Sequence, residues 1–170
     1  DAILAEVSTQ YCVDRARVYA TGYSLGSMFT YEVACQMNDR VAAVASYAGT
    51  MPVSPNSCTR KAPIAIMHLH GDRDATIPYA SEWDWKAWDS VGTMKDVPSL
   101  VAFWRDWNGC ENTADTPTAY GQHTVHDGCA GGVRVEHHRF AGRDHWWPNA
   151  VEGESTHRVI WNFVQQFRRE

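Results

Sequence analysis

An α/β fold, with a mostly parallel sheet and helices on both faces, is the fold class that the sequence predicts. Short apolar segments alternate along the 170 residues with segments of helical periodicity, as in chains built from strand–helix units. The apolar segments are nearly continuous, which is typical of strands buried on both faces. With 44% hydrophobic and 21% charged residues, the chain is long enough for one domain with a sizeable core.

Four segments have the composition expected of the strands. Each is rich in β-branched, aromatic or small apolar residues, and each is followed closely by a glycine. The predicted strands cover residues 17–21, 41–47, 64–69 and 133–140. Because the carboxyl ends of parallel strands meet at one edge of a sheet, side chains that follow these strands are candidates for a ligand site.

Helices are predicted between and after these strands. Residues 25–37 carry apolar side chains at helical spacing, and residues 160–167 form an amphipathic end to the chain. Two more helices are predicted at 81–90 and 99–107. The polar, turn-rich residues 111–128 are predicted to form a long loop.

The eight tryptophans divide into groups with different expected environments. Those at helical spacing beside other apolar residues are predicted to lie in the core, and they are Trp104, Trp107 and Trp161. A second group cannot share one helix face and consists of Trp83, Trp85 and Trp88. At least one of this group should face solvent or a cleft, so residues 79–108 are a candidate lid, insertion or aryl-binding wall.

Charge and cysteine content limit the choice of partner and compartment. The net charge of −5 without a basic block argues against nucleic acid, and no apolar run approaches the ~18–20 residues of a membrane helix. Five cysteines suggest an oxidising, extracellular setting. Cys110 and Cys129 bracket the predicted loop and are a candidate disulfide, with buried free thiols as the alternative. One cysteine is left over, and we expect its partner to lie in sequence preceding Asp1.

The segment Gly22-Tyr23-Ser24-Leu25-Gly26 is a G-x-S-x-G motif between a predicted strand and a predicted helix. In this setting the serine lies on a sharp, strained turn, and side chains in place of the two glycines are expected to collide with the neighbouring elements. The turn exposes the Ser24 hydroxyl, and the start of the helix offers unpaired N–H groups to a developing oxyanion. The alternative is a glycine-flanked turn serine with a structural role.

A nucleophilic serine needs a base, and the base needs an orienting carboxylate. Carboxylates follow the third predicted strand, and a histidine follows the fourth, which reproduces the chain order of serine, acid and histidine in such hydrolases. We therefore predict Ser24, Asp74 and His145 as the catalytic residues. Asp74 is preferred to Asp72, since Asp72 directly follows the strand and is positioned to cap the turn.

The other histidines are given structural interpretations. His68 lies inside a predicted strand and is expected in the core, whereas His123 and His126 are expected to be solvated in the polar loop. His137 and His138 are neighbours in a strand, so they face opposite sides of the sheet. No His or Cys pair has metal-ligand spacing on a helix, so no metal and no cofactor are expected.

Distinctive segments are spread over nearly the whole chain. They are Cys12-Val13-Asp14, residues 17–24, Ala34-Cys35, residues 41–49, residues 70–74 with Ile77-Pro78-Tyr79, Asn108-Gly109-Cys110 and His145-Trp146-Trp147-Pro148. In this order they resemble secreted esterases of carbohydrate esterase family one, the polyhydroxybutyrate depolymerase-like and feruloyl esterases, which are α/β-hydrolases. The resemblance implies Ser24 as nucleophile, Asp74 as acid, His145 as base and the Leu25 N–H as an oxyanion donor.

The chain departs from that family at its beginning. The family's His-Gly loop, which supplies a second oxyanion donor, normally precedes the nucleophile strand, whereas the His70-Gly71 pair here already belongs to the acid segment. Residues 1–170 are therefore expected to be the carboxyl-terminal part of one α/β-hydrolase catalytic domain that lacks its N-terminal strands. A missing N-terminal segment is a candidate partner.

These observations lead to a secreted serine carboxylesterase that acts through an acyl-enzyme. Feruloyl (cinnamoyl) esters of plant polysaccharide are the expected substrate, and Tyr23, Trp146 and Trp147 are the expected substrate-binding residues. A polyhydroxyalkanoate depolymerase is the alternative within the same class. A catalytically inert esterase fragment or binding module is the alternative from another class, and a peptidase is a third possibility.

Overall fold

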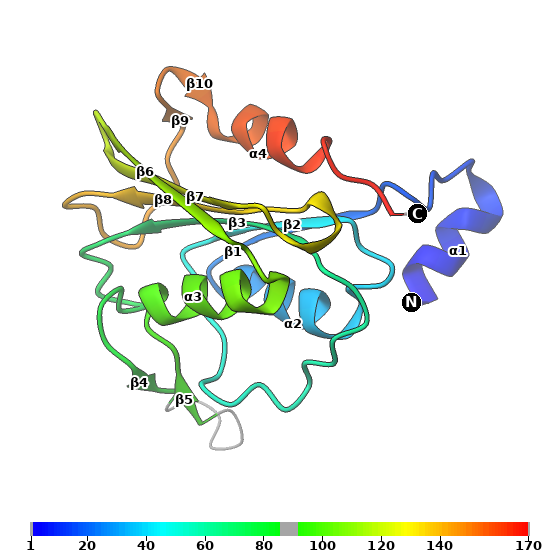
Figure 1. Cartoon of the computed structure of the whole chain (residues 1–170), viewed down its shortest axis with the longest axis horizontal. Helices are drawn as coiled ribbons and strands as arrows, with labels where there is room; N and C mark the ends of the chain where they lie inside the picture. Colours follow the sequence, from blue (N-terminus) through cyan, green and yellow to red (C-terminus); the bar gives the residue numbers. More distant parts are fainter. Residues whose placement is uncertain (1, 86–91, 170) are drawn as a thin grey trace.

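The computed structural model describes residues 2–85 and 92–169, and a six-stranded sheet forms its centre (Figure 1). The strand order is β1 (Tyr19–Tyr23), β2 (Ala43–Tyr47), β3 (Ala65–Gly71), β8 (Val135–Phe140), β7 (Gly121–Asp127) and β6 (Asn112–Thr118). Neighbours from β1 to β8 are parallel, whereas β8–β7 and β7–β6 are antiparallel pairs. The predicted α/β class with a mostly parallel sheet is confirmed.

Helices cover both faces of this sheet. Figure 1 shows α2 (Leu25–Gln36) and α3 (Val97–Asn108) on one face and α4 (Thr156–Val164) on the other, with α1 (Ala2–Gln10) beside the sheet. The remaining short elements are β4 (Trp83–Asp84), β5 (Thr93–Met94), the 3-10 turn Ala130–Gly132, β9 (Ala150–Val151) and β10 (Glu154–Ser155). None of the described helices is long and apolar enough to cross a membrane.

The core has two layers because side chains alternate across each strand. In β2, Ala43, Ala45 and Tyr47 pack toward α4, whereas Val44 packs toward α2 and α3. Every residue of β2 and β3 is buried, as the continuous apolar pattern predicts. Trp104 of α3 is fully buried on the second side.

Helix α3 shows how local sequence sets an element. Asp96 caps its first turn by accepting from the Ser99 N–H at 2.7 Å, and Gly109 ends it in the left-handed conformation. The Asn108 side chain then joins the helix to the sheet, since it donates to the Ile64 carbonyl and accepts from the Ile64 N–H. These contacts fix α3 in the core.

Two predicted elements are wrong. Residues 83–84 of the predicted helix 81–90 form strand β4, and residues 86–91, including Trp88, lie outside the described residues. The predicted loop 111–128 is the β6–β7 hairpin, whose first strand is almost entirely exposed. An edge hairpin without a buried apolar row carries no periodic hydrophobic signal, so its pairing with β8 decides the structure.

Side-chain environments correct three further predictions. His126 in β7 is buried and hydrogen bonds with Thr113 at 2.8 Å, and His123 is partly buried against Glu136, so neither is a solvated loop residue. Trp161 is 54% exposed on the outer side of α4, so it is not in the core.

Two disulfides join four of the five described cysteines. Cys110–Cys129 closes the base of the β6–β7 hairpin, as predicted, and Cys35–Cys58 ties α2 to the loop that follows β2. Cys12 is a free, exposed thiol.

Candidate active site

Ser24 occupies a tight turn between the end of β1 and the start of α2. Its backbone has φ 56° and ψ −120°, a conformation that is costly for a residue with a side chain. The turn is held because the Ser24 N–H donates to the Tyr47 carbonyl at 2.9 Å. This strained strand-to-helix turn is the local structure that the G-x-S-x-G motif predicts.

The two motif glycines have different surroundings. A Cβ atom at Gly22 would lie 2.1 Å from the Gly26 carbonyl oxygen, whereas a Cβ at Gly26 would meet nothing within 4 Å. The expectation that both positions exclude side chains is therefore wrong for Gly26. A glycine outside the motif matters instead, since a Cβ at Gly49 would lie 2.1 Å from the Ser27 hydroxyl oxygen and 3.0 Å from the Ser24 carbonyl oxygen.

Ser24, His145 and Asp74 form a continuous hydrogen-bonded line. His145 Nε2 lies 2.9 Å from Ser24 Oγ, and His145 Nδ1 lies 2.8 Å from Asp74 Oδ2. The three residues follow β1, β8 and β3, whose parallel carboxyl ends share one edge of the sheet. The structure thus brings together the three residues that sequence order selected.

Asp74 is buried, 5% exposed, and both carboxylate oxygens accept hydrogen bonds. Oδ1 accepts the Thr76 and Ile77 N–H groups, each at 2.8 Å, and Oδ2 faces His145 and His70. Burial acts to raise the Asp74 pKa, but the hydrogen bonds from His70, Ile77 and His145 outweigh it and lower the pKa to about 2. Asp74 is therefore a carboxylate at neutral pH.

The neighbouring aspartates hold the loops in place. Asp72 accepts the Gly142 N–H at 2.6 Å and so links the end of β3 to the loop after β8. Asp144 accepts the N–H groups of Ala75 and His145 at 2.8 and 2.6 Å. Asp74, and not Asp72, is the carboxylate beside His145.

A buried chain of side chains behind Asp74 was not anticipated from the sequence. His70 Nε2 lies 3.0 Å from the Ile77 carbonyl oxygen, so this nitrogen carries the proton and Nδ1 accepts. His68 Nε2 therefore donates to His70 Nδ1 at 3.0 Å, and the Tyr31 hydroxyl donates to His68 Nδ1 at 2.6 Å. Burial lowers the pKa of His68 well below its usual value, which agrees with a neutral His68 ring. The network holds the segment that carries Asp74.

The predicted substrate-binding aromatics lie around His145 in different ways. The Tyr23 ring is 5.1 Å from the His145 ring, and Trp147 packs edge-on behind it against Tyr47. Trp146 is 40% exposed and contacts Arg143. Leu25, the predicted oxyanion donor, is the first residue of α2, where backbone N–H groups have no partner within the helix.

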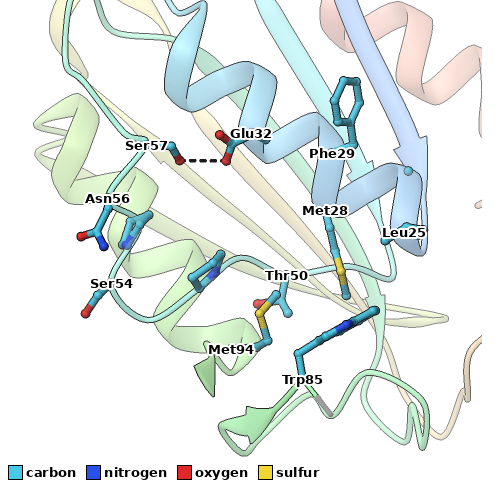
Figure 2. A pocket seen from close by; sticks show the side chains of 13 residues that line it. Leu25, Met28, Phe29, Glu32, Thr50, Ser54, Asn56, Ser57, Trp85 and Met94 are labelled. Carbon is cyan, nitrogen blue, oxygen red and sulfur yellow. Dashed lines mark hydrogen bonds between the residues drawn. The ribbon is translucent and has the colours of Figure 1, made fainter. Parts of the chain in front are cut away.

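Two cavities lie beside the start of α2, and one of them reaches Ser24. The smaller, about 260 Å³, touches Ser24 itself and is walled by Met28, Ile77, Trp83 and Trp85. The larger, about 850 Å³, shares Leu25, Met28 and Trp85 with it. Figure 2 shows the larger cavity with Trp85, Met28 and Met94 at one end and, at the other, the Ser57 hydroxyl donating to Glu32 at 2.8 Å. Neither Trp146 nor Trp147 lines these two cavities.

A serine on a strand–turn–helix elbow, with its histidine and aspartate on loops after later parallel strands, defines an α/β-hydrolase. Within this class, residues 1–88 match the dienelactone hydrolase family, and the chain belongs to that family.

Curated relatives match across nearly the whole chain. It is 28% identical to a bifunctional acetylxylan esterase/xylanase of Neocallimastix patriciarum and 26% identical to feruloyl esterase B of Piromyces equi, over 97% and 96% of this chain. It spans 22% and 30% of the length of these two relatives.

Solved structures share the fold at low sequence identity. A thermostable esterase superposes with a TM-score of 0.58 at 15% identity, over 99% of this chain and 35% of that one. An acetyl xylan esterase from Aspergillus awamori superposes with a TM-score of 0.53 at 16% identity, over 96% of this chain and 66% of that one.

Proposed function

We propose that this chain is the catalytic part of a serine carboxylesterase that hydrolyses its substrate through an acyl-enzyme. The observation that carries the proposal is the line of hydrogen bonds from Ser24 through His145 to Asp74. The names of the relatives, which are esterases, support the same reaction class. A structural serine would not need a histidine at 2.9 Å and a buried carboxylate behind it.

The chemistry follows from this geometry. His145 Nε2 accepts the Ser24 proton as Oγ attacks the ester carbonyl carbon, and a tetrahedral intermediate forms. Asp74, ionised because its pKa is about 2, accepts from Nδ1 and stabilises the imidazolium. His145 then returns the proton to the departing alcohol, and water releases the acid from the acyl-enzyme by the same route.

The oxyanion is assigned to the Leu25 N–H at the start of α2, where the helix end favours negative charge. We propose that a further segment of the protein supplies a second donor and a strand alongside β1. Its support is that β1 is an edge strand of the described sheet and that Leu25 and Phe29 beside it are 52% and 68% exposed.

An aromatic acyl group joined to plant polysaccharide is the substrate class we favour. The apolar cavity at Ser24 is walled by Trp83 and Trp85, which suits a flat aryl ring. The β4–β5 ribbon that carries them is the candidate lid. Tyr23 beside His145, with Trp147 behind it, is assigned to the opposite wall, and Trp146 to more distant contacts with the polymer.

Acetylated xylan is the second candidate substrate. The observation that favours it is the name of the bifunctional relative from Neocallimastix patriciarum. The cavity that touches Ser24, about 260 Å³, is larger than an acetyl group requires, which ranks the aromatic ester first. Polymer-degrading esterases meet their substrates outside the cell, and the two disulfides suit that location.

A panel of esters tests the proposal. Rates are measured with methyl ferulate, acetylated xylan and a short polyhydroxybutyrate oligomer for the chain and for Ser24→Ala. The expected result is the highest kcat/KM on methyl ferulate and loss of about 10³-fold or more in Ser24→Ala. If acetylated xylan is the one ester of the three that is hydrolysed, acetylated xylan and not an aromatic ester is the substrate. No Ser24-dependent turnover of any ester would leave the inert fragment as the better account.

A further inference from the structure

A cluster of two histidines and a glutamate lies on strands β7 and β8, outside the candidate active site. His123 of β7 is directly opposite His138 of β8, and Glu136 is two residues before His138 on the same strand. Alternation along β8 places Glu136 and His138 on the face of Phe140, which packs toward α4. A search for metal ligands at helical spacing does not find this group, because its members lie on two neighbouring strands.

The three potential ligand atoms converge. Glu136 Oε2 is 3.2 Å from His123 Nε2 and 3.9 Å from His138 Nε2, and all three atoms lie within 4.8 Å of one another. Ligand atoms around a tetrahedral Zn²⁺ are about 3.4 Å apart when each lies about 2.1 Å from the metal. The cluster is therefore close to the required spacing, and the imidazole rings of His123 and His138 are stacked with their centroids 4.1 Å apart.

One ligand atom has no other explanation in the fold. His138 is 5% exposed, and among the described residues its Nε2 has no hydrogen-bond partner. An unsatisfied polar atom in the interior costs about 1–3 kcal/mol, so such an atom calls for a partner. This nitrogen faces the Glu136 carboxylate, which is itself 6% exposed.

Outer contacts orient two of these groups for coordination. The Tyr120 hydroxyl lies 2.6 Å from His138 Nδ1, so that ring nitrogen is engaged and Nε2 is left to bind. Arg134 Nε donates to Glu136 Oε1, which leaves Oε2 facing the imidazoles. Metal-binding histidines and carboxylates are commonly held by such second hydrogen bonds.

We propose that His123, Glu136 and His138 form a binding site for a divalent transition metal, with Zn²⁺ as the best-suited ion. Two imidazole nitrogens and one carboxylate oxygen are a preferred donor set for Zn²⁺, with further positions for water. The ion would join β7 to β8 and satisfy His138 Nε2. The site is independent of the proposed esterase chemistry.

The test is zinc binding by the whole chain. The metal-free chain is loaded with Zn²⁺, dialysed and analysed for metal content, and its affinity is measured by titration calorimetry. One Zn²⁺ per chain is expected. His123→Gln and Glu136→Gln should each weaken binding by more than about 100-fold, and Tyr120→Phe by about 10–100-fold. His157→Gln, at an exposed histidine, is the matched control and should leave binding unchanged.

Two readouts keep the result unambiguous. Far-UV circular dichroism checks that each variant is folded, and Co²⁺ in place of Zn²⁺ reports through its visible absorption whether nitrogen and oxygen ligands surround the ion. Failure of the unaltered chain to retain zinc would overturn the proposal. Binding that survives both His123→Gln and Glu136→Gln, or that is lost only in His145→Gln, would place the ion elsewhere and overturn it equally.

Discussion

Asp74 is buried, and each of its two carboxylate oxygens faces hydrogen-bond donors of the candidate site. His145 Nδ1 and His70 Nε2 face one oxygen, and two backbone N–H groups bind the other. Asp72, two residues earlier, bonds to a loop N–H instead. The two aspartates therefore have separable roles.

Exchanging each aspartate for asparagine should reveal this difference. Asp74→Asn is expected to lower kcat/KM on the preferred ester by about 10⁴-fold, because an amide no longer fixes the imidazole in the required tautomer. Asp72→Asn keeps an acceptor oxygen for Gly142 and should cost less than about tenfold. Steady-state kinetics of both variants checks the assignment, and a larger loss in Asp72→Asn would reverse it.

The depressed pKa of Asp74 also predicts a pH dependence of stability. A carboxylate whose pKa falls on folding, from 3.8 to about 2, adds stability above pH 4 that is lost as the pH falls toward 2. This amounts to about 2 kcal/mol. The unfolding free energy, measured in urea near pH 5 and near pH 2, should fall over this range by about 2 kcal/mol more for the unaltered chain than for Asp74→Asn. An equal loss in both would contradict the assigned hydrogen bonds.

At the scale of elements, the β1–α2 elbow is the feature that the sequence predicts best. A five-residue motif encodes it, because the backbone strain at Ser24 and the close approach at Gly22 are local. The β6–β7 hairpin could not be predicted, since its polar strand Asn112–Thr118 becomes a strand only by pairing. The Tyr31–His68–His70 chain is equally hidden, because it requires β3 and α2 to be packed together.

The elbow itself yields a matched pair of variants. Gly22→Ala should destabilise the chain by about 3 kcal/mol or more, since its Cβ would lie 2.1 Å from a backbone oxygen. Gly26→Ala, in open space within α2, should be neutral or stabilising by up to about 1 kcal/mol. Chemical denaturation of both variants measures the difference. Equal effects would show that the turn is not packed as described.

For the whole molecule, the disulfides extend the stabilisation beyond the central core. Cys110–Cys129 joins the end of α3 to the end of β7 across 19 residues, and the hairpin between them is mostly exposed. The sequence predicts this bridge because the cysteines bracket one polar stretch. Cys35–Cys58 could not be assigned in the same way, since α2 and a loop after β2 bring its halves together.

Removing the hairpin disulfide should therefore be costly to the whole fold. The double variant Cys110→Ser/Cys129→Ser is expected to lose about 3 kcal/mol of unfolding free energy, the loop-closure entropy of a loop this long. Cys12→Ser, which alters the free exposed thiol, is the control and should stay within about 0.5 kcal/mol of the unaltered chain. Urea denaturation without reductant measures both. A loss confined to the control would contradict the described pairing.

The proposed esterase chemistry requires Ser24 to be a nucleophile that His145 activates. The most direct measurement is covalent labelling of the folded chain by a fluorophosphonate, with the modified residue located by peptide mass spectrometry. We expect one label per chain on Ser24, and labelling about 10³-fold slower or more in His145→Gln. A chain that stays unlabelled, or one labelled at Ser24 equally fast without His145, would contradict the proposed chemistry.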